Sequence, residues 1–309
     1  MEYSLTVWLF FSIFSAACWS CVNILDSILV NRYEKHPLVL LWCLRVFTLL
    51  LLISFPLFTS LHTKLWWLPF LSGVAMYLPA LVYLSVLEHI DTSVAQSTWA
   101  IESVFLSILG FLFLAESWTP VQTAGAVLII AAVFCLAHWH RYRSVPKTVG
   151  VLTLIALLGA PGEFGIKLSL TLGVSHSQTF FWSILSTSCI AIVFPLLQSS
   201  SRKRIRSLVH TAPPAFYGLL LGDTIISFIG CYTVMKAFEI GPLSLVAIAG
   251  NVQPFFVILF VWLLSKSRST HVPKELLTRQ SVQVKLVSFT LMLVGLGLLI
   301  VNSATNIGG

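Results

Sequence analysis

Five ionisable side chains interrupt otherwise apolar segments of the sequence, and these side chains could support chemistry inside a membrane. They are Arg45, Glu102, Glu163, Lys167 and Asp223. Placing a charged group at the centre of a bilayer costs roughly 2.5–3.5 kcal/mol on insertion scales. We therefore expect each of them to face a wet cavity or a partner of opposite charge, where a substrate or a proton can meet it.

Glu102 is the first candidate for substrate contact or proton coupling, because it stands near the middle of its apolar segment. Asp223 is the second candidate for proton coupling, since it should also lie near mid-depth. Protonation and deprotonation of either carboxyl group would be the coupling step. The alternative for Glu102 is a structural role, in which hydrogen bonds tie its carboxyl group to neighbouring helices.

The other three ionisable residues invite a structural interpretation. Glu163 and Lys167 are four positions apart, so they share one face of a helix. They form an internal salt bridge or contact a substrate. Arg45 is expected to pair with an acidic residue, the alternative being an anchor for an anionic group. The surrounding run GAPGEFG at 159–165 either loosens the helix for binding or serves close helix packing.

Apolar stretches of spanning length follow one another along nearly all of the 309 residues. Only 9% of the residues are charged, against about 25% in soluble domains. A spanning helix needs about 20 mostly apolar residues. We predict spans at 4–29, 37–59, 65–88, 92–114, 120–138, 148–172, 177–198, 213–236, 242–264 and 284–302. The sequence thus predicts an all-α membrane protein, and it leaves no soluble domain for nucleic-acid binding.

The second half of the sequence echoes the first. Gly73 aligns with Gly222, and Tyr83 aligns with Tyr232 at the same offset of 149 positions. The order of spans also matches, which predicts ten transmembrane helices built as two five-helix repeats. An odd number of spans per repeat inverts the second repeat relative to the first, as in many secondary transporters. The predicted repeats are residues 1–139 and 147–309.

Basic residues are concentrated on one side of the predicted spans. The loops that follow the first, third, fifth, seventh and ninth predicted spans hold 14 of the 18 Lys and Arg residues. The positive-inside rule places these loops in the cytoplasm and both termini outside, in the plasma or inner membrane of the cell. A longer basic loop at 265–283 lies on the same side, between spans nine and ten. It either carries a short interfacial helix or is solvated.

Polar and aromatic residues from several spans complete a predicted substrate cavity. Asn251 and Gln253 stand where the repeat places the counterpart of Glu102, so they should face it near the membrane midplane. Trp19 and Trp99 form an aromatic wall for an apolar or cationic substrate, or pack between helices. The full predicted cavity set is Trp19, Asn23, Tyr83, Trp99, Glu102, Glu163, Lys167, Asp223, Tyr232, Asn251 and Gln253.

Local motifs resemble the drug/metabolite transporter superfamily, in particular its EamA-type ten-helix members. The stretch LAESWTPVQTAGAVLIIAAVFCL at 114–136 is similar to the family's junction between helices four and five, with Glu116, Gln122 and Gly125 at the matching positions. The other matching positions are Trp19 and Asn23 of the first helix, Arg45 of the second helix and Pro254 of the ninth helix.

This resemblance implies a ten-helix bundle with a central cavity between the halves. It also implies transport of small organic metabolites, often export of amino acids or related compounds. Three features depart from the family pattern. The second repeat has Ser265 and Lys266 where the family has a Glu at the end of helix nine. Ser103 stands where the first repeat usually has a Pro, and the family usually places both termini in the cytoplasm.

We therefore predict a secondary transporter that moves a small organic metabolite, an amino acid or related compound, by alternating access. A proton or the substrate's own gradient would supply the energy. The alternative is a non-transporting scaffold or receptor subunit, which would bury its polar residues in closed pairs. The expected partners are the substrate and the lipid bilayer, without nucleic acid. The oligomeric state is open, and a monomer is compatible with two fused repeats.

Neither an enzymatic activity nor a cofactor or metal site is expected. The sequence has no H-E-x-x-H, G-x-S-x-G or Walker A motif. Cys18 and Cys21 form a C-x-x-C, but a zinc site of this kind needs a second pair of ligands. We interpret the two cysteines as small apolar residues on one helix face.

Overall fold

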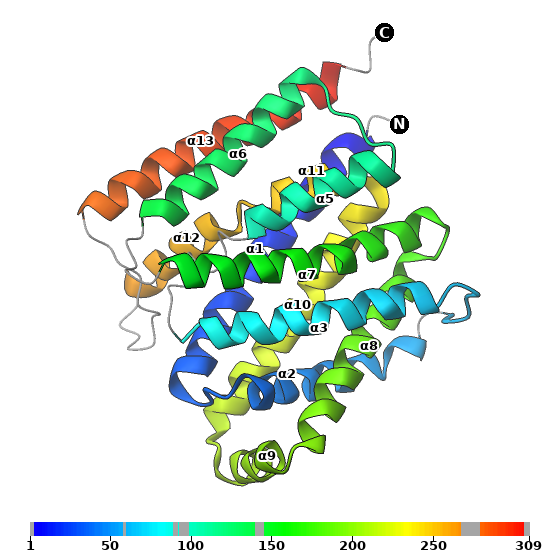
Figure 1. The fold of residues 1–309 in the computed structure, drawn as a ribbon, viewed down its shortest axis with the longest axis vertical. Helices are drawn as coiled ribbons and strands as arrows, with labels where there is room; N and C mark the ends of the chain where they lie inside the picture. Colours follow the sequence, from blue (N-terminus) through cyan, green and yellow to red (C-terminus); the bar gives the residue numbers. More distant parts are fainter. Residues whose placement is uncertain are drawn as a thin grey trace.

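The computed structural model describes residues 3–57, 60–88, 92, 99–139, 145–266 and 279–305. Its elements are helices, and no β-strand occurs among these residues (Figure 1). The helices are α1 (Tyr3–Arg32), α2 (Pro37–Leu52), the short 3₁₀ helix η1 (Phe55–Leu57), α3 (Trp67–Val86), α5 (Trp99–Phe113), α6 (Pro120–Trp139), α7 (Val145–Thr171), α8 (His176–Leu197), α9 (Ser199–Thr211), α10 (Pro214–Ile240), α11 (Leu243–Gly250), α12 (Gln253–Lys266) and α13 (Arg279–Thr305).

Within the described residues, seven helical segments are long and apolar enough to cross a membrane. They are Val7–Arg32, Pro37–Leu57, Trp67–Val86, Thr153–Thr171, His176–Leu197, Pro214–Ile240 and Leu243–Lys266. Shorter apolar helices cover Ile101–Phe113, Pro120–Ala132 and Leu286–Leu298. The prediction of a helical, multi-pass membrane protein is confirmed. The arrangement as ten spans in two inverted repeats stays a prediction.

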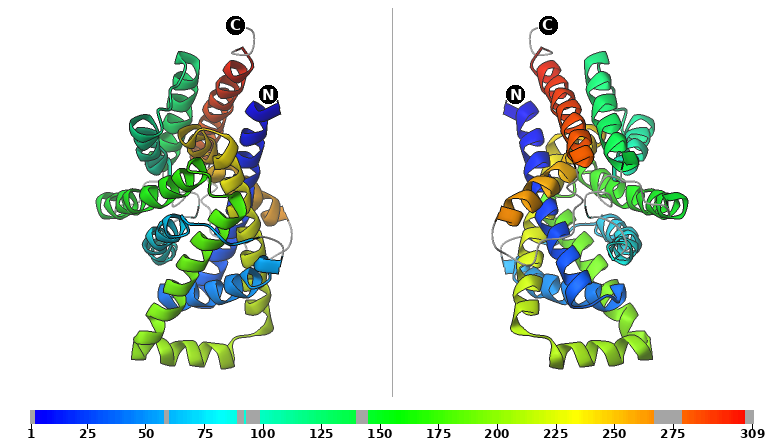
Figure 2. Two further views of the ribbon diagram at one scale, coloured as in Figure 1. Left: turned by 90° about the vertical axis from the view of Figure 1, so that its right-hand side faces the viewer. Right: turned by 90° about the vertical axis from the view of Figure 1, so that its left-hand side faces the viewer.

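α9 lies across the ends of α8 and α10 (Figure 2), in a stretch that the sequence analysis treated as a loop. Its Arg204 contacts the connection between α1 and α2. Arg204 Nη2 lies 2.9 Å from Glu34 Oε1, and Arg204 Nε donates to Glu34 Oε2 over 3.2 Å. The backbone N–H of His36 also donates to Glu34 Oε1. The Glu34 side chain is only 5% exposed, so this ion pair holds α9 against the bundle.

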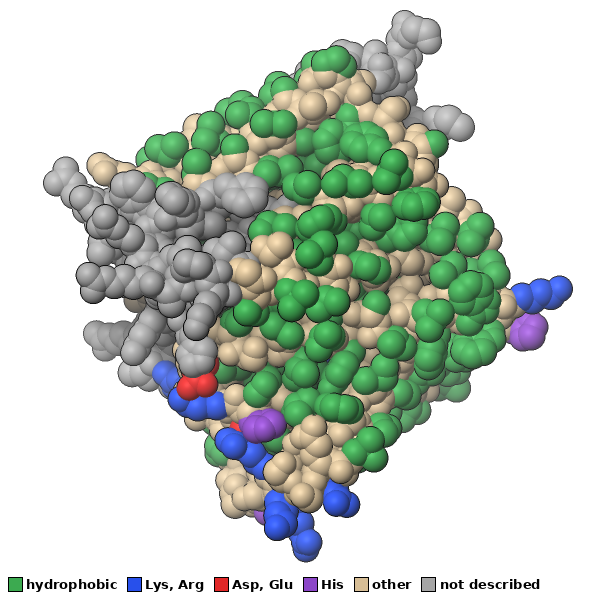
Figure 3. Space-filling model, in the orientation of Figure 1, with side chains coloured by type: hydrophobic (Ala, Val, Ile, Leu, Met, Phe, Trp, Pro, Cys, Tyr) green, Lys and Arg blue, Asp and Glu red, His purple; other side chains and the backbone are tan. Residues whose placement is uncertain are grey.

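The outer surface of the helices is apolar. Figure 3 shows hydrophobic side chains over most of the visible face, with Lys and Arg side chains at its edges. Large apolar side chains such as Leu50, Leu112 and Leu197 are 61%, 71% and 74% exposed. Lipid tails are as apolar as these side chains, so a bilayer accommodates them without the cost that water would impose.

α3 and α8 approach each other at a glycine. A Cβ atom at Gly73 would overlap the carbonyl oxygen of Ser183 and the hydroxyl of Ser186. Thr187 Oγ1 donates a hydrogen bond of 2.6 Å to the Gly73 carbonyl. Close backbone approach at small residues is how helices gain contact in lipid, where no hydrophobic force drives them together.

α7 uses the glycines of the GAPGEFG run for the same purpose. The helix continues without a break through Pro161. A Cβ at Gly162 would meet Met76, and one at Gly165 would meet Ser72, both on α3. Of the two interpretations of this run, close packing is therefore the one that the fold favours.

The predicted ninth span, 242–264, is broken instead. α11 ends at Gly250, and α12 begins at Gln253. Pro254 explains the break, because proline lacks a backbone N–H and its ring clashes with the carbonyl four residues earlier. The two intervening residues, Asn251 and Val252, are thereby placed at the break, next to α5.

Arg204→Ala should lower the apparent Tm of the purified protein in detergent, because it leaves the Glu34 carboxylate buried without its partner. We expect a loss of about 2 kcal/mol or more. Arg202→Ala on the same helix is the control, because among the described residues Arg202 forms no ion pair, and its Tm should match wild type. Equal Tm values for both variants would contradict the structural role of the Arg204–Glu34 pair.

Gly73→Ala should strongly destabilise the bundle, since α3 and α8 must move apart to admit the methyl group. Gly222→Ala is the matched control, because Gly222 is the repeat counterpart in the sequence alignment and nothing lies within 4 Å of a Cβ there. Thermal unfolding in detergent should show a fall of several degrees only for Gly73→Ala. Equal stability of the two variants would show that the contact between α3 and α8 is not tight.

Candidate functional site

A cavity of about 280 Å³ lies among α1, α2, α3, α5, α7, α8, α10 and α11. Nine of the eleven residues predicted for the substrate cavity line it. They are Trp19, Asn23, Tyr83, Trp99, Glu102, Glu163, Asp223, Asn251 and Gln253. The structure thus brings together residues from both halves of the sequence in one space.

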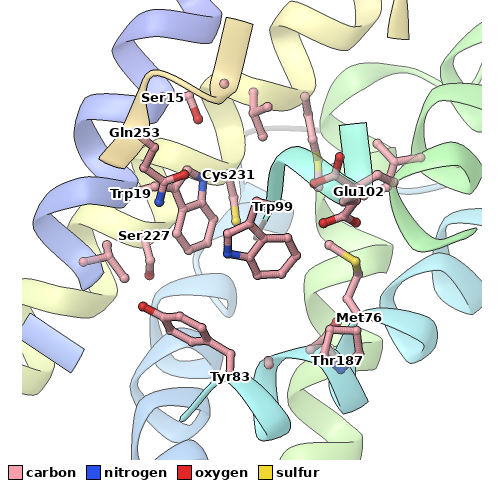
Figure 4. Close-up of a pocket in the computed structure, with 18 of the residues that line it drawn as sticks. Ser15, Trp19, Met76, Tyr83, Trp99, Glu102, Thr187, Ser227, Cys231 and Gln253 are labelled. Atoms are coloured by element: carbon pink, nitrogen blue, oxygen red, sulfur yellow. The ribbon is translucent and has the colours of Figure 1, made fainter. Parts of the chain in front are cut away.

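Three aromatic side chains frame this space. Figure 4 shows the indole of Trp99 at the centre of the view, with Trp19 and Tyr83 on one side of it and Glu102 on the other. The rings of Tyr83 and Trp99 lie 6.4 Å apart at an angle of 50°. Tyr83 Oη donates to Asn23 Oδ1 over 2.8 Å, which connects α3 to α1. The aromatic wall is therefore held by contacts between helices.

Glu102 lies against α7 rather than free in the cavity. A Cβ at Gly159 would fall 2.5 Å from Glu102 Oε1, so the missing side chain makes room for the carboxylate. Glu163, one turn further along α7, interacts electrostatically with Glu102. Glu102 is 3% exposed, and its Oε1 has no hydrogen-bond partner. Two carboxyl groups therefore meet at this wall of the cavity.

Lys167 and Tyr232 do not line the cavity, unlike the other predicted residues. Lys167 Nζ donates to the carbonyls of Phe238 and Gly241 over 2.6 and 2.8 Å, at the end of α10. No ion pair with Glu163 is found among the described residues, so the structure differs from the expected salt bridge. A cation at a helix C-terminus satisfies its free carbonyls and complements the helix dipole.

Tyr232 is directed to another part of the bundle. It is 38% exposed, and its ring contacts His176 and Phe180 of α8 at centroid distances of 4.2 and 5.4 Å. The sequence alignment paired Tyr232 with Tyr83, but only Tyr83 lines the cavity.

Arg45 lines the cavity together with Asp26 and Asp223. Both aspartates interact electrostatically with Arg45, but neither forms an ion pair with it within 4 Å, so the expected pairing stays a prediction. The sequence analysis did not single out Asp26, because it stands near the end of its predicted span. Helical spacing could have identified Asp26 as a cavity residue. Trp19, Asn23 and Asp26 are four and three positions apart, so they share one helix face.

The break between α11 and α12 faces α5. Asn251 Nδ2 donates to Ser103 Oγ over 2.8 Å, and Ser103 directly follows Glu102. Ser20 of α1 donates to the Gln253 carbonyl over 2.9 Å. The segment predicted as the counterpart of Glu102 therefore does lie beside the helix of Glu102.

Residues 6–137 match the model of the EamA-like transporter family. The first half of this chain is EamA-like. The resemblance to the drug/metabolite transporter superfamily is thereby confirmed for residues 6–137, and the protein is an integral, multi-pass membrane protein. No curated protein matches the chain.

The fold is shared with solved structures, 25 chains of which match. One of them, described only as the crystal structure of a protein, superposes with a TM-score of 0.70 at 11% identity. The match covers 98% of this chain and 99% of that one. At this identity the similarity concerns the fold alone.

Two of the three EamA-like junction residues stabilise helix ends. Glu116 accepts hydrogen bonds from the backbone N–H groups of Leu243 and Ser244 over 2.5 and 3.1 Å, and from the Ser244 hydroxyl. These are free N–H groups of the first turn of α11. Gln122 and Thr119 bond reciprocally, side chain to backbone, in a capping box at the start of α6.

The third junction residue, Gly125, lies at a close helix contact that Gly295 of α13 permits. A Cβ at Gly295 of α13 would lie 2.7 Å from the Gly125 carbonyl of α6 and 2.7 Å from the Ile129 side chain. α6 and α13 pack side by side at this point (Figure 1). The EamA-like junction thus builds the frame around the cavity and does not line it.

Glu116→Ala should destabilise the EamA-like fold, because α11 loses the acceptor for its first N–H groups. The loss of a helix cap costs about 1–2 kcal/mol. Glu116→Gln, which keeps one acceptor oxygen, should fall between Glu116→Ala and wild type. Glu239→Gln is the control, since Glu239 lies at the surface beside Lys236. Unchanged thermal stability of Glu116→Ala in detergent would show that the cap is dispensable.

Proposed function

We propose that the protein is a secondary transporter for a small organic metabolite, an amino acid or a related compound, and that it works by alternating access. The observation that carries this proposal is the cavity. Its wall combines aromatic and ionisable side chains inside a membrane protein, and ionisable groups at that depth mark substrate or ion pathways. A scaffold has no need for such a space.

The contacts between helices support an arrangement as two inverted repeats, residues 1–139 and 147–309. In the two repeats, α1, α2, α3, α5 and α6 correspond to α7, α8, α10, α11–α12 and α13. The contact of α1 with α10 then matches that of α7 with α3, and the contact of α5 with α7 matches that of α12 with α1. The contacts α2–α8, α6–α13 and α5–α11 each join two corresponding helices. A pseudo-two-fold axis of this kind gives two halves that can rock around a fixed central site.

Glu102 and Asp223 are the proposed proton-coupling residues. Glu102 is supported by its neighbour Glu163, because two nearby carboxylates repel each other and protonation of one relieves that repulsion. Asp223 is supported by its place beside Asp26 and Arg45 on the cavity wall. Opening of the cavity to one side of the membrane or the other would then change access of protons to these groups.

The proposal is tested first by ligand binding and then by transport. A panel of amino acids and related metabolites is screened by thermal shift, and each ligand found is used in counterflow with proteoliposomes. We expect counterflow with the wild type, and loss of its pH dependence in Glu102→Gln. Glu239→Gln, outside the cavity, should behave as wild type.

Two results would overturn parts of this proposal. Ligands that bind without any counterflow would favour a receptor or scaffold. Counterflow that is independent of pH in both wild type and Glu102→Gln would keep the transporter and remove proton coupling.

A further inference from the structure

The cavity carries an excess of acidic groups. Among the described residues that line it are four carboxyl groups, and they face one guanidinium group, that of Arg45. The acidic residues are Asp26, Glu102, Glu163 and Asp223. Lys167 of α7 is held by backbone carbonyls outside the lining. A single guanidinium cannot neutralise this set, so the wall attracts positive charge.

The aspartates have unused acceptor atoms. Asp26 and Asp223 are 6% and 3% exposed, and Asp26 Oδ1 and Asp223 Oδ2 have no hydrogen-bond partner. They come from α1 and α10, which pack side by side, and both line the cavity. Arg45 interacts with both but lies within 4 Å of neither carboxylate. A buried acceptor without a donor is costly, and a ligand that donates N–H groups would relieve that cost.

Aromatic rings lie on the same face as this acidic pair. Trp19 is seven positions before Asp26 on α1, so the two side chains share one helix face. Trp19 and Trp99 border the central space in Figure 4. An indole face attracts an ammonium group by about 0.5–2 kcal/mol, more when water is excluded. The combination of carboxylates and indole rings favours a cation with an organic body.

We propose that the cavity binds organic ammonium cations, with the ammonium group between Asp26 and Asp223 and the organic part against Trp19 and Trp99. This inference rests on the proposed transport function and specifies its substrate class, an amine among the compounds related to amino acids. Arg45, on the same wall of the cavity, offsets part of the negative charge of the two aspartates without pairing with either. A ligand that also carries a carboxylate would add a negative charge to a cavity wall that already has four carboxyl groups and one guanidinium group.

Three probes of one shape test this proposal: 2-phenylethylamine, phenylalanine and 3-phenylpropanoate, which are a cation, a zwitterion and an anion. Binding to the full-length protein in detergent is measured by thermal shift. We expect the amine to stabilise the wild type most and the anion not at all. Asp26→Asn and Asp223→Asn should each weaken amine binding at least tenfold, while Glu239→Gln should not. Tighter binding of phenylalanine or of the anion would overturn the proposal.

Cys231 provides a second readout that needs no change in the proposed site. It lines the same cavity, where both Arg45 and Glu163 interact with its thiol. A variant with Cys231 as its single cysteine therefore shows whether the acidic groups outweigh Arg45. A cationic methanethiosulfonate should label it at least tenfold faster than an anionic one, after each rate is normalised to a free thiol. Equal rates, or faster anionic labelling, would overturn the proposal even if the aspartate variants fail to fold.

The failure of transport and the failure of this inference are distinguishable. Amine binding without counterflow would leave the cation site intact and remove the transport function. Counterflow of phenylalanine or of the anion, without amine binding, would leave the transport function and remove the cation site.

Discussion

The structure depends on one constraint, which is that polar groups inside a bilayer have no water to bond with. Seven ionisable residues inside the bundle meet this constraint in one of two ways. Lys167 and Glu116 are bonded to free backbone groups at the ends of α10 and α11. Asp26, Arg45, Glu102, Glu163 and Asp223 instead surround the cavity. The first group stabilises the fold, and the second group is the one that we propose to meet a substrate.

The close helix contacts around the cavity depend on glycines, which have no side chain, as much as on the side chains that pack there. Gly73 lets α3 meet α8, Gly159 makes room for the Glu102 carboxylate, and Gly295 lets α13 meet α6. In lipid, such contacts come from close packing, because burial of apolar surface brings no gain there. The positions of the acidic groups are thus fixed by glycines that carry no chemistry themselves.

The EamA-like resemblance has two structural meanings. Its junction residues, Glu116, Gln122 and Gly125, stabilise helix ends and helix contacts away from the cavity. Trp19 and Arg45, which also resemble the family, line the cavity itself. Asp26 and Asp223 carry no part of the resemblance. The residues of the family resemblance thus build the frame and part of the cavity wall, while the two aspartates of the proposed cation site lie outside the resemblance.

The sequence by itself determined the membrane class, the position of most spans, the family resemblance and nine residues of the cavity wall. These follow from composition, apolar length and the cost of charge in lipid, which act locally along the chain. Only the tertiary structure decided which side chains lie next to one another. It placed Glu163 beside Glu102 instead of Lys167, and it brought Asp26 to the cavity. It also broke the ninth span before Pro254. Partners depend on which helix faces meet, and helical spacing alone cannot specify that.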